Sequence, residues 1–169
     1  MKLIFSLVIA VTLSPIWPLG QNPLIGDPYI IINKHTNELA YVNYGAIQEV
    51  YPIATGVTAD MTPEGEYTIT VKAKDPYYRR KDIIGGSKNN PLGTRWLGFD
   101  ARETDGRIYG IHGTNNEESI GKYVSNGCVR MHNKNVENLF NKVPVGTKVY
   151  IYSKDISFEQ VAKIKRAIP

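Results

Sequence analysis

The one cysteine of this 169-residue chain, Cys128, and a histidine sixteen positions before it, His112, are the side chains best suited to covalent chemistry. A thiol is nucleophilic only as its thiolate, and a nearby imidazole or cation is the usual means of lowering a thiol pKa of about 8.5. Three glycines adjoin these residues and leave room for a substrate to approach the backbone: Gly110, Gly113 and Gly127. This pattern predicts acyl transfer through a thioester.

The same stretch supplies the other groups that such a reaction needs. His112 is the candidate general base, and its imidazole must come within about 3.5 Å of the sulfur. The backbone N–H groups of Gly127 and Cys128 are candidates for stabilising an oxyanion. Arg130 has two interpretations, because its guanidinium could bind a substrate carboxylate through a bidentate fork or brace the turn that carries the cysteine.

Two other kinds of site use the same residue types. Cys128, His112 and His132 could supply three zinc ligands, but no fourth ligand stands at a usual spacing, and we predict neither a metal nor a cofactor. A buried, inert cysteine is the other interpretation, and the adjoining Gly127 and Arg130 argue against it. We expect His132, four residues past the cysteine, to support the turn or the following helix.

The segments His-Gly-Thr at 112–114 and Ser-Asn-Gly-Cys-Val-Arg-Met at 125–131 together resemble the catalytic motif of the L,D-transpeptidase (YkuD-type) domains of bacterial cell walls. The resemblance extends over residues 28–152. It implies that Cys128 is the nucleophile and His112 the base. It also implies that the backbone carbonyl of Gly113 fixes the tautomer of His112, as a third group must.

The resemblance assigns roles to neighbouring residues as well. Ser125 stands at the family's Ser/Thr position and would orient the site by hydrogen bonding. Beside these family assignments, our own candidates for oxyanion and substrate binding are Tyr109, Asn126, Gly127 and Arg130. Many members have a histidine where this chain has Asn126, so a mechanism that relies on that second histidine does not apply here.

The function implied by the resemblance is that of a peptidoglycan L,D-transpeptidase. Such an enzyme cleaves the tetrapeptide stem, releases D-alanine and passes the acyl group from its cysteine to an amine of a neighbouring stem. Carbapenems acylate the same cysteine in the family. Two alternatives are an L,D-carboxypeptidase with water as acceptor and a non-catalytic wall-binding module of the same fold. Sortase-like transpeptidation ranks lower, because its histidine lies much further upstream of the cysteine.

Composition sets broad limits on the protein. A chain of 169 residues with 42% hydrophobic and 21% charged residues suits one globular domain with its own core. The net charge is +4, but Lys and Arg are scattered and their largest cluster is Arg79-Arg80-Lys81. We therefore predict no nucleic-acid partner. We expect peptidoglycan stem peptides as the partner and a monomeric protein.

The first residues resemble a secretory signal. Met1-Lys2 precedes an apolar run over residues 3–13, which is shorter than the ~20 apolar residues that span a bilayer. We interpret residues 1–26 as this signal, with cleavage between residues 14 and 26. The alternative is a short membrane-proximal anchor that stays attached. We expect an exported protein, in the cell wall or secreted, with no membrane span in its mature form.

The elements that must position the site are mostly strands. We expect a mainly β domain over residues 28–152, an antiparallel β-sandwich or meander of the L,D-transpeptidase type with one or two short helices. An amphipathic helix should follow in the extension at 153–169. The expected strands cover 29–33, 39–43, 47–54, 67–72, 96–99, 108–112 and 148–152. The expected short helices lie within 115–124 and from residue 133 or 135 to Pro144.

Residues 75–95 lack a clear period and contain Tyr77, Tyr78, Gly85 and Gly86. A segment of this length inside a compact domain is either functional or mobile. Aromatic residues beside glycine hinges suit a lid over a cleft. The family resemblance likewise implies a loop that borders the substrate groove.

Overall fold

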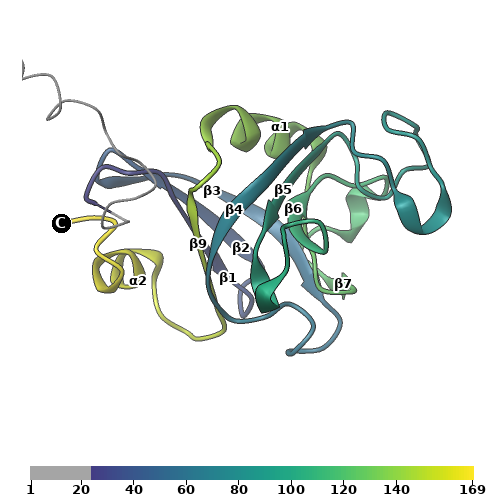
Figure 1. The fold of residues 1–169 in the computed structure, drawn as a ribbon. Coiled ribbons are helices and arrows are strands. Elements are labelled where there is room, and N and C mark those ends of the chain that lie inside the picture. Colours follow the sequence, from purple (N-terminus) through teal and green to yellow (C-terminus); the bar gives the residue numbers. More distant parts are fainter. Residues whose placement is uncertain (1–23) are drawn as a thin grey trace, which may run out of the picture.

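The computed structural model describes residues 24–169, and its fold is mainly β, as predicted (Figure 1). The strands are β1 (Tyr29–Asn33), β2 (Glu38–Asn43), β3 (Ala46–Gly56), β4 (Gly65–Lys74), β5 (Arg95–Phe99), β6 (Tyr109–His112), β7 (Tyr123–Ser125), β8 (Val129–Met131) and β9 (Lys148–Tyr152). The α-helices are α1 (Asn133–Lys142) and α2 (Phe158–Ile164). Short 3-10 turns lie at Arg79–Lys81, Ala101–Glu103 and Glu117–Ser119.

The strands pair in the order β2-β1-β9-β4-β5-β6-β8-β3-β7. Because β3 also pairs with β2, the sheet curls round and closes on itself, with β7 outside the ring. The first three strands form the expected antiparallel meander, and Tyr44 and Gly45, both at positive φ, make the turn between β2 and β3. The structure adds three parallel pairings, β1 with β9, β3 with β7 and β6 with β8.

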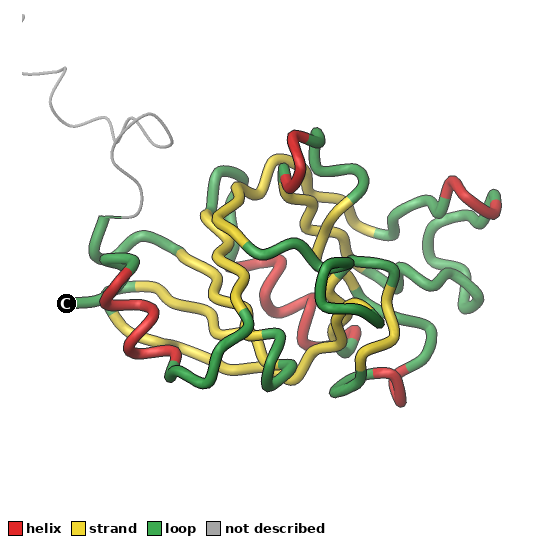
Figure 2. Tube along the Cα trace, turned by 90° about the horizontal axis from the view of Figure 1, so that it is seen from below, coloured by secondary structure: helices red, strands yellow, loops and turns green. Residues whose placement is uncertain are grey.

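Alternate residues of β1 face two different cores. Ile30 and Ile32 join the main core inside the sheet, whereas Tyr29 and Ile31 join a second cluster under α2. Helix α2 begins with a capping box, in which Ser157 and Gln160 bond each other's backbone N–H. The C-terminal extension thus packs against the sheet beside β1 (Figures 1 and 2).

Helix α1 follows β8 directly and covers β5 and β6. Its buried side chains are Val136, Leu139 and Phe140, at the spacing of one helical face. The helix therefore closes the core behind the end of β6, where His112 lies.

Residues 115–124 differ from the short helix that the sequence predicted. They form only the 3-10 turn Glu117–Ser119, and the chain then extends into β7. Asn116 makes no side-chain capping bond, and Gly121 adopts a φ of +84°, which ends any helical path. The hydroxyl of Tyr123 donates to the carbonyls of Lys34 and His35, at 2.9 and 3.0 Å. This contact holds β7 against the meander.

The proposed signal over residues 1–26 falls almost entirely outside the described residues. Within residues 24–169, no helix combines the length and apolarity that crossing a membrane requires.

Candidate active site

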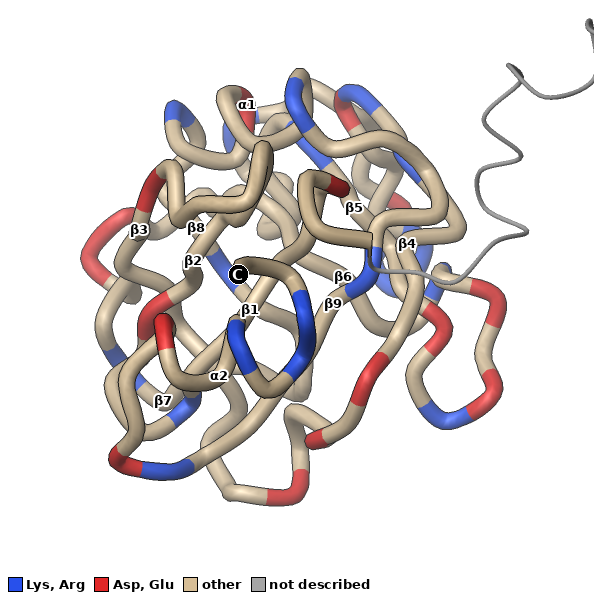
Figure 3. The backbone as a smooth tube through the Cα atoms, turned by 90° about the vertical axis from the view of Figure 1, so that its left-hand side faces the viewer, with Lys and Arg blue, Asp and Glu red and all other residues tan. Residues whose placement is uncertain are grey.

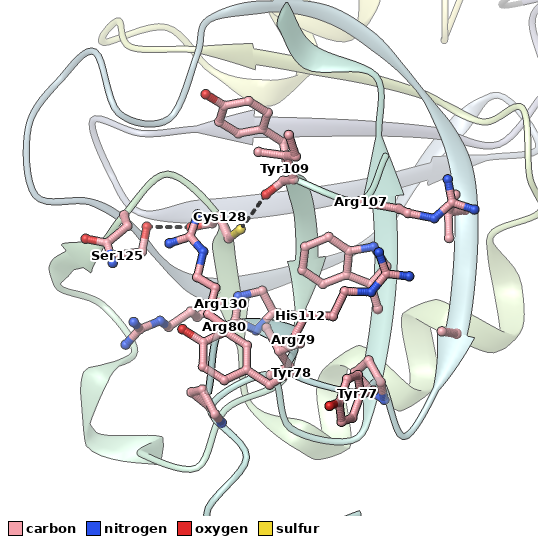
Figure 4. Close-up of a pocket in the computed structure, with 18 residues that line it drawn as sticks. Tyr77, Tyr78, Arg79, Arg80, Arg107, Tyr109, His112, Ser125, Cys128 and Arg130 are labelled. Atoms are coloured by element: carbon pink, nitrogen blue, oxygen red, sulfur yellow. Dashed lines mark hydrogen bonds between the residues drawn. The ribbon is translucent and has the colours of Figure 1, made fainter. Parts of the chain in front are cut away.

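The parallel pairing of β6 with β8 brings the two reactive residues together. Its register places Ile111 beside Val129 and His112 beside Arg130. Parallel strands need a crossover of about a dozen residues or more, and residues 113–128 supply it. Cys128, which directly precedes β8, and His112, which ends β6, consequently line one pocket of about 500 Å³ (Figure 4).

The imidazole of His112 is held in one tautomer. Its Nδ1 lies 2.6 Å from the carbonyl oxygen of Gly113. A carbonyl can only accept, so Nδ1 carries the proton and Nε2 keeps a free lone pair. The ring of Trp96 stacks on the imidazole at a centroid distance of 5.6 Å. This arrangement prepares Nε2 to act as a base.

Burial keeps this histidine neutral. His112 is only 4% exposed, and this burial lowers its pKa from 6.5 to about 4. The charge of Arg130 acts in the same direction, while the hydrogen bond to the Gly113 carbonyl opposes it. At neutral pH the imidazole is therefore uncharged.

Cys128 is half-buried, and its Sγ lies 3.4 Å from the carbonyl oxygen of Ile108, to which the thiol donates (Figure 4). Burial raises the pKa of the thiol from 9.0 to about 11, against the opposing effects of the Gly110 backbone and the charges of Arg80 and Arg130. The resting pair is thus a neutral thiol and a neutral imidazole. The S–H bond must turn from Ile108 toward His112 before the proton can be transferred.

The turn before the nucleophile is bound together by Ser125. Its Oγ accepts a hydrogen bond from the Gly127 N–H at 3.1 Å and donates one to the Cys128 carbonyl at 2.6 Å. Gly127 has a φ of +122°, and a Cβ there would lie 2.6 Å from the Met61 carbonyl oxygen. The Gly127 N–H thus serves the turn in this structure, and Ser125 would have to release it before it could stabilise an oxyanion.

The sequence-predicted residues fall into two groups. One group lines the pocket and consists of Cys128, His112, Ser125, Tyr109, Asn126 and Arg130. The other, Gly113 and Gly127, adjoins the pocket along the chain. Among the described residues no carboxylate lies within ion-pair distance of Arg130. Its guanidinium is therefore available to an anionic ligand.

His132 lies apart from this group. It pairs with Glu117 through Nδ1 and does not line the pocket that holds Cys128 and His112. Over residues 24–169, no three His, Cys, Asp or Glu side chains converge as a metal site requires. The zinc alternative needed these three residues to meet, and their described positions do not provide that geometry.

The structure reveals one residue whose role the sequence did not indicate, Asn133. Its Oδ1 accepts from the backbone N–H groups of Thr94 and Thr114, both at 3.2 Å. Its Nδ2 donates to the Thr114 carbonyl at 2.7 Å and to Glu117 at 2.9 Å. A Cβ on Gly113 would lie only 2.1 Å from Asn133 Oδ1. Asn133 thus clamps the segment whose carbonyl orients His112.

The fold and the site together match one class of protein, the L,D-transpeptidase catalytic domains. The family model described as YkuD, L,D-transpeptidase catalytic domain, matches residues 27–151. The chain belongs to this family.

Known relatives and structures agree with this assignment. YqjB of Bacillus subtilis (strain 168), which carries an L,D-transpeptidase name, is 60% identical over 164 residues, 97% of this chain and 93% of YqjB. An L,D-transpeptidase structure from Mycobacterium smegmatis matches with a TM-score of 0.59 and 18% identity, over 76% of this chain. This chain spans only 59% of that structure.

A second solved structure is the catalytic domain of the Enterococcus faecium L,D-transpeptidase, determined by NMR after acylation by ertapenem. It matches with a TM-score of 0.57 and 22% identity, over 76% of this chain and 98% of that domain. At such identities the two structural matches show the shared fold.

Proposed function

We propose that this protein is a peptidoglycan L,D-transpeptidase that works through an acyl-enzyme on Cys128. The observation that carries the proposal is the shared pocket of Cys128 and a neutral His112 whose free nitrogen is fixed by Gly113. Membership of the YkuD family supports the choice of substrate. So does the E. faecium domain, which was acylated by ertapenem.

The acylation step follows from the neutral pair. As the Cys128 sulfur attacks the carbonyl carbon of the scissile L,D bond, His112 Nε2 takes the thiol proton. The carbon–nitrogen bond to D-alanine then breaks, and the leaving amine receives that proton. The stem remains on the sulfur as a thioester.

The transfer step reverses this proton movement. An amine of a neighbouring stem attacks the thioester carbonyl and gives a proton to His112. The sulfur leaves as a thiolate and recovers its proton from the imidazolium. The products are a cross-linked pair of stems and the original neutral site. Water in place of the amine would give the carboxypeptidase alternative with the same residues.

Intact-protein mass spectrometry with a stem tetrapeptide tests this proposal. We expect an adduct on Cys128 with the mass of the tetrapeptide less D-alanine, and D-alanine free in solution. With an acceptor stem present, a cross-linked dimer should form, whereas a tripeptide product alone would indicate the carboxypeptidase. Absence of both adduct and D-alanine release would contradict the proposal.

We further propose that the protein acts outside the cytoplasm, where its polymeric substrate lies. The apolar run at residues 3–13 supports export. Fractionation of producing cells tests this part, since a chain found only in the cytoplasm would exclude it.

Asn133→Ala should slow turnover by lowering kcat while leaving KM nearly unchanged, because Asn133 touches the segment behind His112 rather than the pocket. Loss of its part-buried hydrogen bonds should cost about 1–3 kcal/mol of stability. Steady-state kinetics and denaturant unfolding measure both effects.

The matched control is Asn138→Ala on the same helix, whose amide bonds Glu49 and Tyr51 away from the site. It should leave kcat unchanged. Equal effects of the two substitutions on kcat would show that Asn133 acts only through the stability of the helix.

A further inference from the structure

Part of the segment at residues 75–95 lines the pocket and has regular local structure. Tyr78 and Ile83 form a β-bridge, with hydrogen bonds of 2.9 Å from Tyr78 N–H and 3.2 Å from Ile83 N–H. The 3-10 turn Arg79–Lys81 lies between them. This small hairpin presents Arg79 and Arg80 to the pocket (Figure 4).

The base of the hairpin is anchored at Asn90, which is 1% exposed. Its Nδ2 donates to the carbonyls of Pro76 at 2.7 Å and Ile84 at 3.2 Å. Gly85 packs so closely on Asp75 that an added Cβ would lie 1.8 Å from the Asp75 carbonyl oxygen. These contacts fix the backbone of the hairpin, and the exposed side chains of Arg79 and Arg80 line the pocket that holds the nucleophile.

The charge of the pocket is strongly one-sided. Its lining contains four arginines and no aspartate or glutamate: Arg79, Arg80, Arg107 and Arg130. On the side of the molecule where α2 lies, by contrast, basic and acidic residues alternate along the chain (Figure 3). Like charges gathered in a partly enclosed site repel one another, so the pocket favours an anionic ligand.

The two hairpin arginines are free to bind such a ligand. Arg107 pairs with Asp105, whereas no carboxylate of the described residues pairs with Arg79 or Arg80. The nearby carboxylate of Asp82 instead accepts from the Tyr77 hydroxyl. A guanidinium pair matches the geometry of a carboxylate through parallel N–H donors.

We propose that Arg79 and Arg80 form a subsite for a carboxylate on the part of the donor peptide that stays on the enzyme. This inference rests on the proposed function for the identity of the donor. Arg130 lies two residues past the nucleophile on β8, whereas the hairpin forms another wall of the pocket. The subsite makes the enzyme selective for stems whose side-chain carboxylates are free rather than amidated.

Paired donor peptides test the subsite. The wild type and an Arg79→Gln/Arg80→Gln double variant are each given a stem tetrapeptide with free side-chain carboxylates and the same peptide with those groups amidated. For the wild type, kcat/KM should favour the free form by about ten- to a hundredfold, as expected for charge-assisted hydrogen bonds. In the double variant this preference should fall to about one.

Lys81→Gln is the matched control, since Lys81 belongs to the same turn but does not line the pocket. It should keep the wild-type preference. A wild type that does not favour the free form, or a double variant that keeps the wild-type preference, overturns the subsite.

Binding to a Cys128→Ala variant separates this inference from the proposed function. If the wild type turns over neither peptide, the transpeptidase proposal fails, but calorimetry with the two peptides still tests the subsite. Tighter binding of the free form, lost on adding Arg79→Gln/Arg80→Gln, supports the subsite independently of turnover. Equal binding of both forms, or none, overturns it.

Discussion

Cys128→Ala is expected to abolish release of D-alanine from a stem tetrapeptide, with a fall in kcat of roughly 10⁵-fold or more. No second thiol exists in the chain to replace the lost sulfur. The covalent route through a thioester is then closed, and His112 has no thiol to deprotonate within the pocket. Release of D-alanine, followed by chromatography over hours, measures the effect.

The substitution should spare the fold, which makes the result interpretable. Cys128 is half-buried, and alanine keeps the Cβ and removes only the sulfur. That sulfur makes a hydrogen bond to the Ile108 carbonyl. Thermal unfolding should therefore move by only a few degrees. If the variant kept full turnover, the acyl-enzyme proposal would be wrong. A wild type that binds stems without turning them over would instead support the wall-binding module.

Local patterns were enough to predict much of the fold. The β-branched run at residues 29–33, the turn at Tyr44-Gly45 and the apolar spacing of α1 each reflect neighbours in sequence, and the structure has these elements. The parallel pairing of β6 with β8 was beyond such patterns, because it depends on contacts between strands separated by a sixteen-residue connection. That pairing is nevertheless what places His112 beside the nucleophile's strand.

The candidate site, like the fold, was predictable from local sequence patterns but not where it depends on long-range contacts. Cys128 and His112 could be predicted because their chemistry and flanking glycines are visible in the sequence. The clamp by Asn133 could not, since Asn133 bonds Thr94, 39 positions before it, and Thr114, 19 positions before it. In the sequence, Arg79 and Arg80 stand out only as part of the largest basic cluster. Only the folded hairpin shows that they line the pocket.

The pKa values of the neutral pair predict an unusual pH profile for kcat/KM. The reaction needs His112 unprotonated, so activity should fall only as pH drops through its pKa of about 4. An imidazole with its ordinary pKa of 6.5 would already lose about tenfold per pH unit below that value. We therefore expect nearly constant kcat/KM from pH 8 to about pH 5. A profile that halves near pH 6.5 would show that His112 is not the buried neutral base described here.

Removing the base should change the shape of this profile as well as its height. His112→Gln is expected to lower kcat/KM by about 10²–10⁴-fold at pH 7. Attack would then depend on the small fraction of thiolate, and the residual rate should rise tenfold per pH unit toward the Cys128 pKa of about 11. His132→Gln is the matched control, because His132 pairs with Glu117 outside the pocket, and it should leave the wild-type profile intact. If His112→Gln kept the flat profile, some other group would have to accept the thiol proton. His112 would then not be the general base for Cys128.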